Sequence, residues 1–169
     1  TVVTTGLGIV EKEFLVRRTG ARVGDLLCIT GIPGQAQAWL DGYSQFRKSL
    51  FEPQPRVGEG KLLGRAGASA MMDDSDGIAL SLHDLVSVND CGFSVDSAKL
   101  PHPSGIPADR WRELALYGGG DYELIFTIAP ERFPVVGVAA TAIGTVIPEK
   151  KVLADDAALE RRGYQHQWE

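Results

Sequence analysis

Three carboxylates and a hydroxyl group lie within four consecutive positions, Asp73, Asp74, Ser75 and Asp76, directly before a predicted helix. Like charges repel one another, so such crowding needs a compensating partner. A divalent cation with oxygen ligands is one such partner, and the free N–H groups of a helix start favour phosphate. This pattern indicates metal and nucleotide chemistry. An ordinary turn with an Asp or Ser helix cap explains it equally simply, and residues 70–77 alone favour that explanation.

The composition restricts the classes of protein that remain. The chain has 169 residues, 44% of them hydrophobic, which is enough for one well-packed domain. It carries 22 acidic and 17 basic residues, a net charge of -5, without a basic stripe, so we expect no nucleic acid partner. No apolar run approaches 18 residues and no secretory signal is evident, so we expect no membrane partner. Cys28 and Cys91 lack metal-ligand spacing, and we expect them to be reduced in a cytoplasmic protein.

The hydrophobic pattern predicts an α+β fold, because strands and helices are mixed along the chain without a strict βαβ repeat. The strand at 122–128 is predicted to lie inside the sheet, because it has no internal Gly or Pro. The glycine-rich turn at 31–34 has the layout of a phosphate cradle, but it lacks the lysine of a P-loop. Strands are expected at residues 1–10, 26–30, 93–96, 122–128 and 141–147, and helices at 35–51, 61–69, 78–89 and 109–116, the last capped by Asp109.

Three motifs occur in the order in which they occur in thiamine-monophosphate kinases, at residues 72–77, 118–124 and 163–166. Looser matches lie at 18–25, 55–57 and 143–146, so the resemblance covers nearly the whole chain. These kinases belong to the aminoimidazole-ribonucleotide synthase superfamily. The resemblance implies the C-terminal domain of that fold, with a mixed sheet and helices packed on one side. It assigns residues 1–16 to the last strand and linker of a missing N-terminal domain, and residues 17–169 to the C-terminal kinase domain.

The resemblance also implies a function, namely phosphorylation of thiamine monophosphate to thiamine diphosphate with ATP and magnesium. The full-length protein is expected to be a homodimer, and this chain alone is expected to be inactive. Two alternatives remain open. One is another ATP-using member of the superfamily, and the other is a non-catalytic domain that binds nucleotide or a protein partner.

Roles for individual residues follow from the same resemblance. Asp73 and Asp76 resemble magnesium ligands, and Ser75 and Arg18 resemble ATP contacts, although Arg18 could also be a solvated loop charge. Asp74 occupies a usually apolar position, so it is expected to point away from the metal. No residue is assigned a catalytic role, because positioning and electrostatics do most of the work in phosphoryl transfer.

The substrate-binding positions include one departure from the family. Gly120, Asp121 and Tyr164 match substrate-binding positions, but the family commonly has Glu where this chain has Gly120. Asp121 could replace that carboxylate, or the acceptor could differ, so the identity of the acceptor stays open. Tyr164 resembles an aromatic residue that stacks on the substrate ring, and its alternative role is to close the core. We expect the tail at 163–166 to fold back beside the turn at 118–121.

Overall fold

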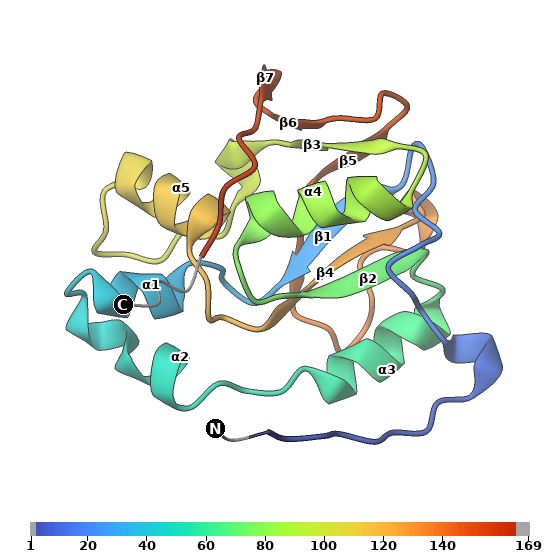
Figure 1. Ribbon diagram of the computed structural model, residues 1–169, viewed down its shortest axis with the longest axis horizontal. Coiled ribbons are helices and arrows are strands. Elements are labelled where there is room, and N and C mark those ends of the chain that lie inside the picture. The colour runs from blue at the N-terminus through green and yellow to red at the C-terminus, as the bar shows by residue number, and fades with distance from the viewer. Residues whose placement is uncertain (1–2, 165–169) are drawn as a thin grey trace.

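Seven strands form one mixed sheet in the computed structural model, which describes residues 3–164 (Figure 1). The strand order is β2-β4-β1-β5-β3-β6-β7. All neighbouring strands are antiparallel except β3 and β6, which are parallel. The strands are β1 (Leu26–Thr30), β2 (Ala70–Asp74), β3 (Gly92–Val95), β4 (Glu123–Ile128), β5 (Ala140–Ile147), β6 (Val152–Ala154) and β7 (Ala157–Ala158).

Five α-helices accompany the sheet, and the described residues contain no helix long and apolar enough to cross a membrane. The α-helices are α1 (Gln35–Leu40), α2 (Arg47–Phe51), α3 (Val57–Ala66), α4 (Ile78–Val88) and α5 (Ala108–Tyr117). Short 3-10 helices are η1 (Lys12–Phe14), η2 (Ser44–Phe46), η3 (Ser97–Lys99) and η4 (Pro130–Arg132). The α+β fold class and the mixed sheet are therefore as predicted.

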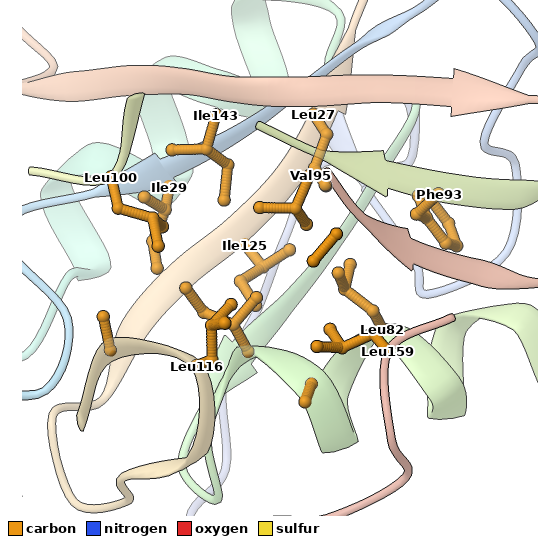
Figure 2. Packing of buried hydrophobic residues seen from close by; sticks show 14 of the residues in the cluster. Leu27, Ile29, Leu82, Phe93, Val95, Leu100, Leu116, Ile125, Ile143 and Leu159 are labelled. Atoms are coloured by element: carbon orange, nitrogen blue, oxygen red, sulfur yellow. The ribbon is translucent and has the colours of Figure 1, made fainter. Parts of the chain in front are cut away.

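Side chains alternate along each strand, so the strands place apolar residues on both faces of the sheet. Each face is buried by its own apolar cluster. Leu27 and Ile29 of β1 enter the larger apolar cluster, to which α1, α4 and α5 contribute (Figure 2). Cys28 faces the other way, into a smaller cluster with Leu63 of α3. The prediction of helices on one side holds for α1, α4 and α5, whereas α3 lies on the opposite face. Leu63 of α3 packs there against the strand side chains that point away from the larger cluster.

Several predicted elements differ in the structure. Residues 3–10 form no strand, and Leu7 and Ile9 are fully exposed, because no strand of the described chain pairs with this segment. The helix expected at 35–51 is divided into α1, η2 and α2, since Gly42 adopts a φ of 97° after α1. Helix α3 begins at Val57 rather than residue 61.

Other differences concern ends and short strands. Helix α5 begins after Pro107, so Asp109 lies inside its first turn and is not the cap. Residues 70–74 form strand β2, where only an acidic segment before a helix was expected, and β6 and β7 were not predicted. The strand expected at 122–128 is β4, and it lies between β2 and β1, so its interior position is confirmed.

Three turns meet at one end of the sheet because of the strand register. Asp74, the last residue of β2, pairs with Glu123, the first residue of β4. Thr30, the last residue of β1, donates its hydroxyl to the Glu123 carboxylate over 2.5 Å. The turns that follow β1, follow β2 and precede β4 therefore lie together.

Candidate functional site

Backbone hydrogen bonds join the acidic turn (residues 73–77), the glycine turn (residues 118–121) and the end of the described chain. The N–H of Gly120 donates to the carbonyl of Ser75 over 2.9 Å. The N–H of Tyr122 donates to the carbonyl of Asp74 over 3.1 Å, and that of Tyr164 to the carbonyl of Asp76 over 2.9 Å. The three motifs singled out in the sequence therefore form one site.

Close backbone approach explains why this site needs glycine. A Cβ atom on Gly119 would lie 2.7 Å from the Cβ of Tyr164 and 2.8 Å from the carbonyl oxygen of Ser75. Both separations are shorter than side chains tolerate, so only glycine fits. Residues 163 and 164 thus fold back beside the glycine turn as predicted, and residues 165–166 lie outside the described residues.

The acidic turn presents its charged groups in two directions. Asp73 lies on strand β2 with half of its side chain exposed, and its Oδ1 is 3.7 Å from a guanidinium nitrogen of Arg18. Ser75 donates its hydroxyl to Oδ2 of Asp76 over 3.3 Å. Arg18, Asp73, Ser75 and Asp76, four of the residues predicted from the sequence, are thus grouped around one turn. A guanidinium can bind phosphate, and a carboxylate can bind a cation, so this group has the chemistry that the sequence predicts for it.

Asp74 faces away from this group and into the protein. Its side chain is buried, because the alternation of β2 places it on the face opposite Asp73. Oδ1 accepts a hydrogen bond of 3.2 Å from the hydroxyl of Ser81, whereas Oδ2 has no partner among the described residues. Burial, assisted by the charge of Asp121, raises the pKa of Asp74 well above its usual range. Asp74 therefore belongs to the packing beneath the site.

The carboxylates of the turn suit a magnesium ion that also binds phosphate. Magnesium is usually held by one or two carboxylates together with substrate phosphates and water. Within residues 3–164, no group of three or more His, Cys, Asp or Glu side chains is arranged to hold a metal alone. Asp73 and Asp76 fit the first description, since the turn supplies two carboxylates, and Asp73 lies 3.7 Å from an arginine that could bind the same phosphate.

Asp121 connects the glycine turn to the start of α1. Its Oδ2 accepts the N–H of Gly34 over 2.5 Å, and its Oδ1 accepts the N–H of Ala36 over 2.8 Å. Burial raises the pKa of Asp121 to about 6, although these N–H groups act in the opposite direction. Both carboxylate oxygens thus bind backbone amides, a local role that the sequence did not indicate. The substrate-binding role of Asp121 stays a prediction.

Gly120 lies in the left-handed region with a φ of 94°. A Cβ atom there would lie 3.2 Å from the Cβ of Ala36. A side chain at this position is therefore strained, which is consistent with glycine where the resemblance leads one to expect Glu.

A hollow of about 510 Å³ opens beside Asp121. On its wall the guanidinium of Arg56 forms two hydrogen bonds of 2.6 and 2.8 Å with the Glu123 carboxylate. This ion pair further raises the pKa of Arg56. The sequence analysis did not identify this ion pair as part of the site. The loose family match at residues 55–57, which includes Arg56, was the one feature that could have indicated it. The hollow is lined by residues that include Gly31, Gln35, Lys48, Arg56, Asp121 and Glu123.

Comparisons with known proteins agree with one another. No protein-family model matches the chain. Thiamine-monophosphate kinase from Methanospirillum hungatei is 44% identical over 168 residues, which is 99% of this chain and 59% of that protein. The crystal structure of thiamine-monophosphate kinase from Stenotrophomonas maltophilia has a TM-score of 0.80 at 30% identity, over 88% of this chain and 55% of that one.

A further similar structure was solved as a complex. AaThiL in complex with AMPPCP and TMP has a TM-score of 0.77 at 26% identity and covers 90% of this chain and 54% of that one. The chain thus spans a little over half the length of the relatives it matches, and corresponds to their C-terminal half. The similarity in sequence and in fold extends over nearly all of the chain, and the motifs of the site lie within it. Over nearly its whole length, the chain is homologous to the C-terminal half of thiamine-monophosphate kinases.

Proposed function

We propose that the full-length protein transfers the terminal phosphoryl group of ATP to the phosphate of thiamine monophosphate, and that this chain contributes the C-terminal half of the enzyme. The observation that carries the proposal is the acidic turn with Asp73, Ser75 and Asp76, which has Arg18 3.7 Å from Asp73 and lies directly beside the glycine turn and Tyr164. The relative AaThiL, solved with AMPPCP and TMP, supports both ligands.

The groups of the acidic turn and Arg18 each have a proposed task in this reaction. Asp73 and Asp76 hold magnesium together with phosphate oxygens of ATP, and magnesium when bound neutralises the charge of those oxygens. The Arg18 guanidinium binds a phosphate oxygen, and the Ser75 hydroxyl donates to another. These residues orient the terminal phosphate toward the acceptor. Orientation and charge compensation supply most of the rate enhancement in phosphoryl transfer, so no general base is assigned.

The acceptor is proposed to bind along the glycine turn, with Tyr164 stacked on its heteroaromatic ring. The side chain of Tyr164 is about half exposed, and its backbone is tied to Asp76, so the ring lies close to the acidic turn. Gly120 and Asp121 belong to the same glycine turn, and Asp121 also lines the neighbouring hollow. Gly120 leaves no carboxylate at the position where the resemblance leads one to expect Glu, and this favours a second candidate, a related phosphomonoester as acceptor.

Three further proposals concern the whole protein. Residues 1–16 are proposed to belong with an N-terminal domain, since the relatives are longer than this chain. The full-length protein is proposed to form a homodimer and to work in the cytoplasm. The free cysteines Cys28 and Cys91 agree with that location.

The test is a kinase assay of the full-length gene product with ATP and magnesium, with thiamine monophosphate and a panel of other phosphomonoesters as acceptors. We expect formation of thiamine diphosphate that depends on all three components. If only a different acceptor is phosphorylated, that compound, and not thiamine monophosphate, is the substrate. Nucleotide binding without turnover of any acceptor would favour a non-catalytic binding domain and contradict the proposal.

A further inference from the structure

We propose that Asn89 is a positioning residue, which holds the Arg18 loop so that its guanidinium meets phosphate beside Asp73. The inference rests on the proposed role of Arg18 in binding nucleotide. Asn89 follows helix α4 directly and is buried, with 7% of its surface exposed. Although Asn89 is 71 residues away from Arg18 in the sequence, the two are joined by a hydrogen bond.

The side chain of Asn89 uses its whole hydrogen-bonding capacity. Its Oδ1 accepts the N–H groups of Gly20 and Ala21 over 2.9 and 3.1 Å. Its Nδ2 donates to the carbonyls of Arg18 and Leu85 over 2.9 and 2.8 Å. An Asn amide offers two acceptor sites and two donor hydrogens, and all four are satisfied here. Three of the four bonds reach the loop that carries Arg18.

The opposite side of the same loop is fixed by strand β2. The N–H of Met71 donates to the carbonyl of Arg17 over 2.9 Å. Gly20 has a φ of 117°, and a Cβ atom there would lie only 2.5 Å from the carbonyl oxygen of Ser69, so the loop is seated tightly against the start of β2. The backbone of Arg18 is therefore held between β2 and Asn89.

This arrangement matters because the side chain of Arg18 is long and 56% exposed. Aligning such a side chain on a phosphate costs conformational entropy, and a fixed backbone lowers that cost. From the held backbone, the guanidinium extends to within 3.7 Å of Asp73. Asn89 itself does not touch the proposed ligand site and acts only through Arg18.

A purely structural alternative exists for one of the four bonds. The bond from Asn89 to the carbonyl of Leu85 closes the last turn of α4, and helix capping of this kind affects stability alone. The bonds to Arg18, Gly20 and Ala21 do not serve the helix. A test must therefore separate loss of stability from loss of the arginine's position.

The experiment is a double-mutant cycle on the full-length gene product, with a non-hydrolysable ATP analogue and magnesium as the probe. Dissociation constants are measured for wild type, Asn89→Ala, Arg18→Ala and the double variant, below the lowest melting temperature of the four. Ser87→Ala is the matched control, since its hydroxyl bonds only the carbonyl of Asp84 in the same helix end. Acceptor KM is measured in parallel.

We expect Asn89→Ala and Arg18→Ala each to weaken binding of the analogue roughly tenfold, while acceptor KM stays within about twofold. In the Arg18→Ala background, Asn89→Ala should have no further effect on binding, because Asn89 acts through that arginine. Ser87→Ala should bind like wild type. If Asn89→Ala does not fold, Asn89→Asp serves in its place, since it keeps the acceptor for Gly20 and Ala21 but loses the donor to Arg18.

Two results would overturn the inference. In the first, the Asn89 variant binds the analogue like wild type and only its melting temperature is lower. Asn89 would then serve only to cap the helix. The other is equal weakening with and without Arg18, which means that Asn89 does not act through it. Absence of analogue binding by wild type is a distinguishable result, because it contradicts the proposed function itself and the inference fails with it.

Discussion

Asp121 is a carboxyl group on which two opposing effects act, so replacing it with Asn tests which effect is larger. Burial disfavours its charged form, whereas the N–H groups of Gly34 and Ala36 favour it. Burial prevails and raises the pKa from 3.8 to about 6. The sequence places Asp121 in a glycine-rich turn, and nothing in that context indicates a raised pKa.

The consequence for stability has a definite sign. Because its folded-state pKa is raised, Asp121 binds a proton more tightly in the folded chain than in the unfolded chain. Its contribution is fully present below about pH 4 and is lost as the pH rises through about 6. Each pKa unit corresponds to about 1.4 kcal/mol, so the loss amounts to at most about 3 kcal/mol. Asn does not titrate, so Asp121→Asn lacks this pH dependence.

The assay is urea unfolding of the wild-type chain and the Asp121→Asn chain at several values between about pH 4 and pH 7. Loss of one accepted N–H bond costs the variant about 1–3 kcal/mol at every pH. Relative to wild type, however, the variant should gain up to about 3 kcal/mol as the pH rises across this range. A difference that stays constant would show that the amide donors balance burial, and one that changes in the opposite direction would show that they outweigh it; either result would refute the reasoning.

The remaining predictions concern the core, the acceptor and the isolated chain. Ile125→Ala should lower the free energy of unfolding by about 2–5 kcal/mol, because Ile125 is fully buried in β4. Val136→Ala, at an exposed position, should change it by less than about 0.5 kcal/mol, and chemical denaturation compares the two. Tyr164→Ala in the full-length protein should raise acceptor KM roughly tenfold and leave the KM for ATP near wild type, as steady-state kinetics would show; a joint shift would make Tyr164 a packing residue. These 169 residues alone should unfold cooperatively yet show no turnover of ATP with thiamine monophosphate, and measurable turnover would contradict the need for a further domain.

The long apolar strands could be predicted from the sequence because their own residues determine them. Strand β4 is mostly apolar, with Leu, Ile and Phe side chains, and it contains no Gly or Pro, so its position inside the sheet could be predicted. Strand β2 was missed, because its last residues are acidic and resemble a turn. It is a strand because of its pairing with β4, where Met72 lies opposite Ile125. The two partners are 53 positions apart in the sequence, so the residues of β2 alone do not indicate a strand.

The site shows the same distinction between local and distant effects. The acidic turn could be recognised from residues that are consecutive in the chain. The roles of Asp121 and Asn89 could not, because their partners lie 68 to 87 positions away in sequence for the bonds that matter. Residues 3–10 form no strand for a related reason, since a β-branched segment does not form a strand without a neighbouring strand to pair with.

The central claim is that Asp73 and Asp76 hold magnesium together with nucleotide phosphates. The most direct test is calorimetric titration of the full-length protein with an ATP analogue, with and without magnesium, for wild type and the Asp73→Asn/Asp76→Asn double variant. The control is the Asp84→Asn/Asp90→Asn double variant, which removes the same charge from ion pairs with Arg161 and Lys150 elsewhere on the surface. We predict that magnesium-dependent binding disappears in the first variant, with a melting temperature near wild type, and persists in the control. Magnesium-dependent binding that survives loss of both carboxylates would contradict the claim.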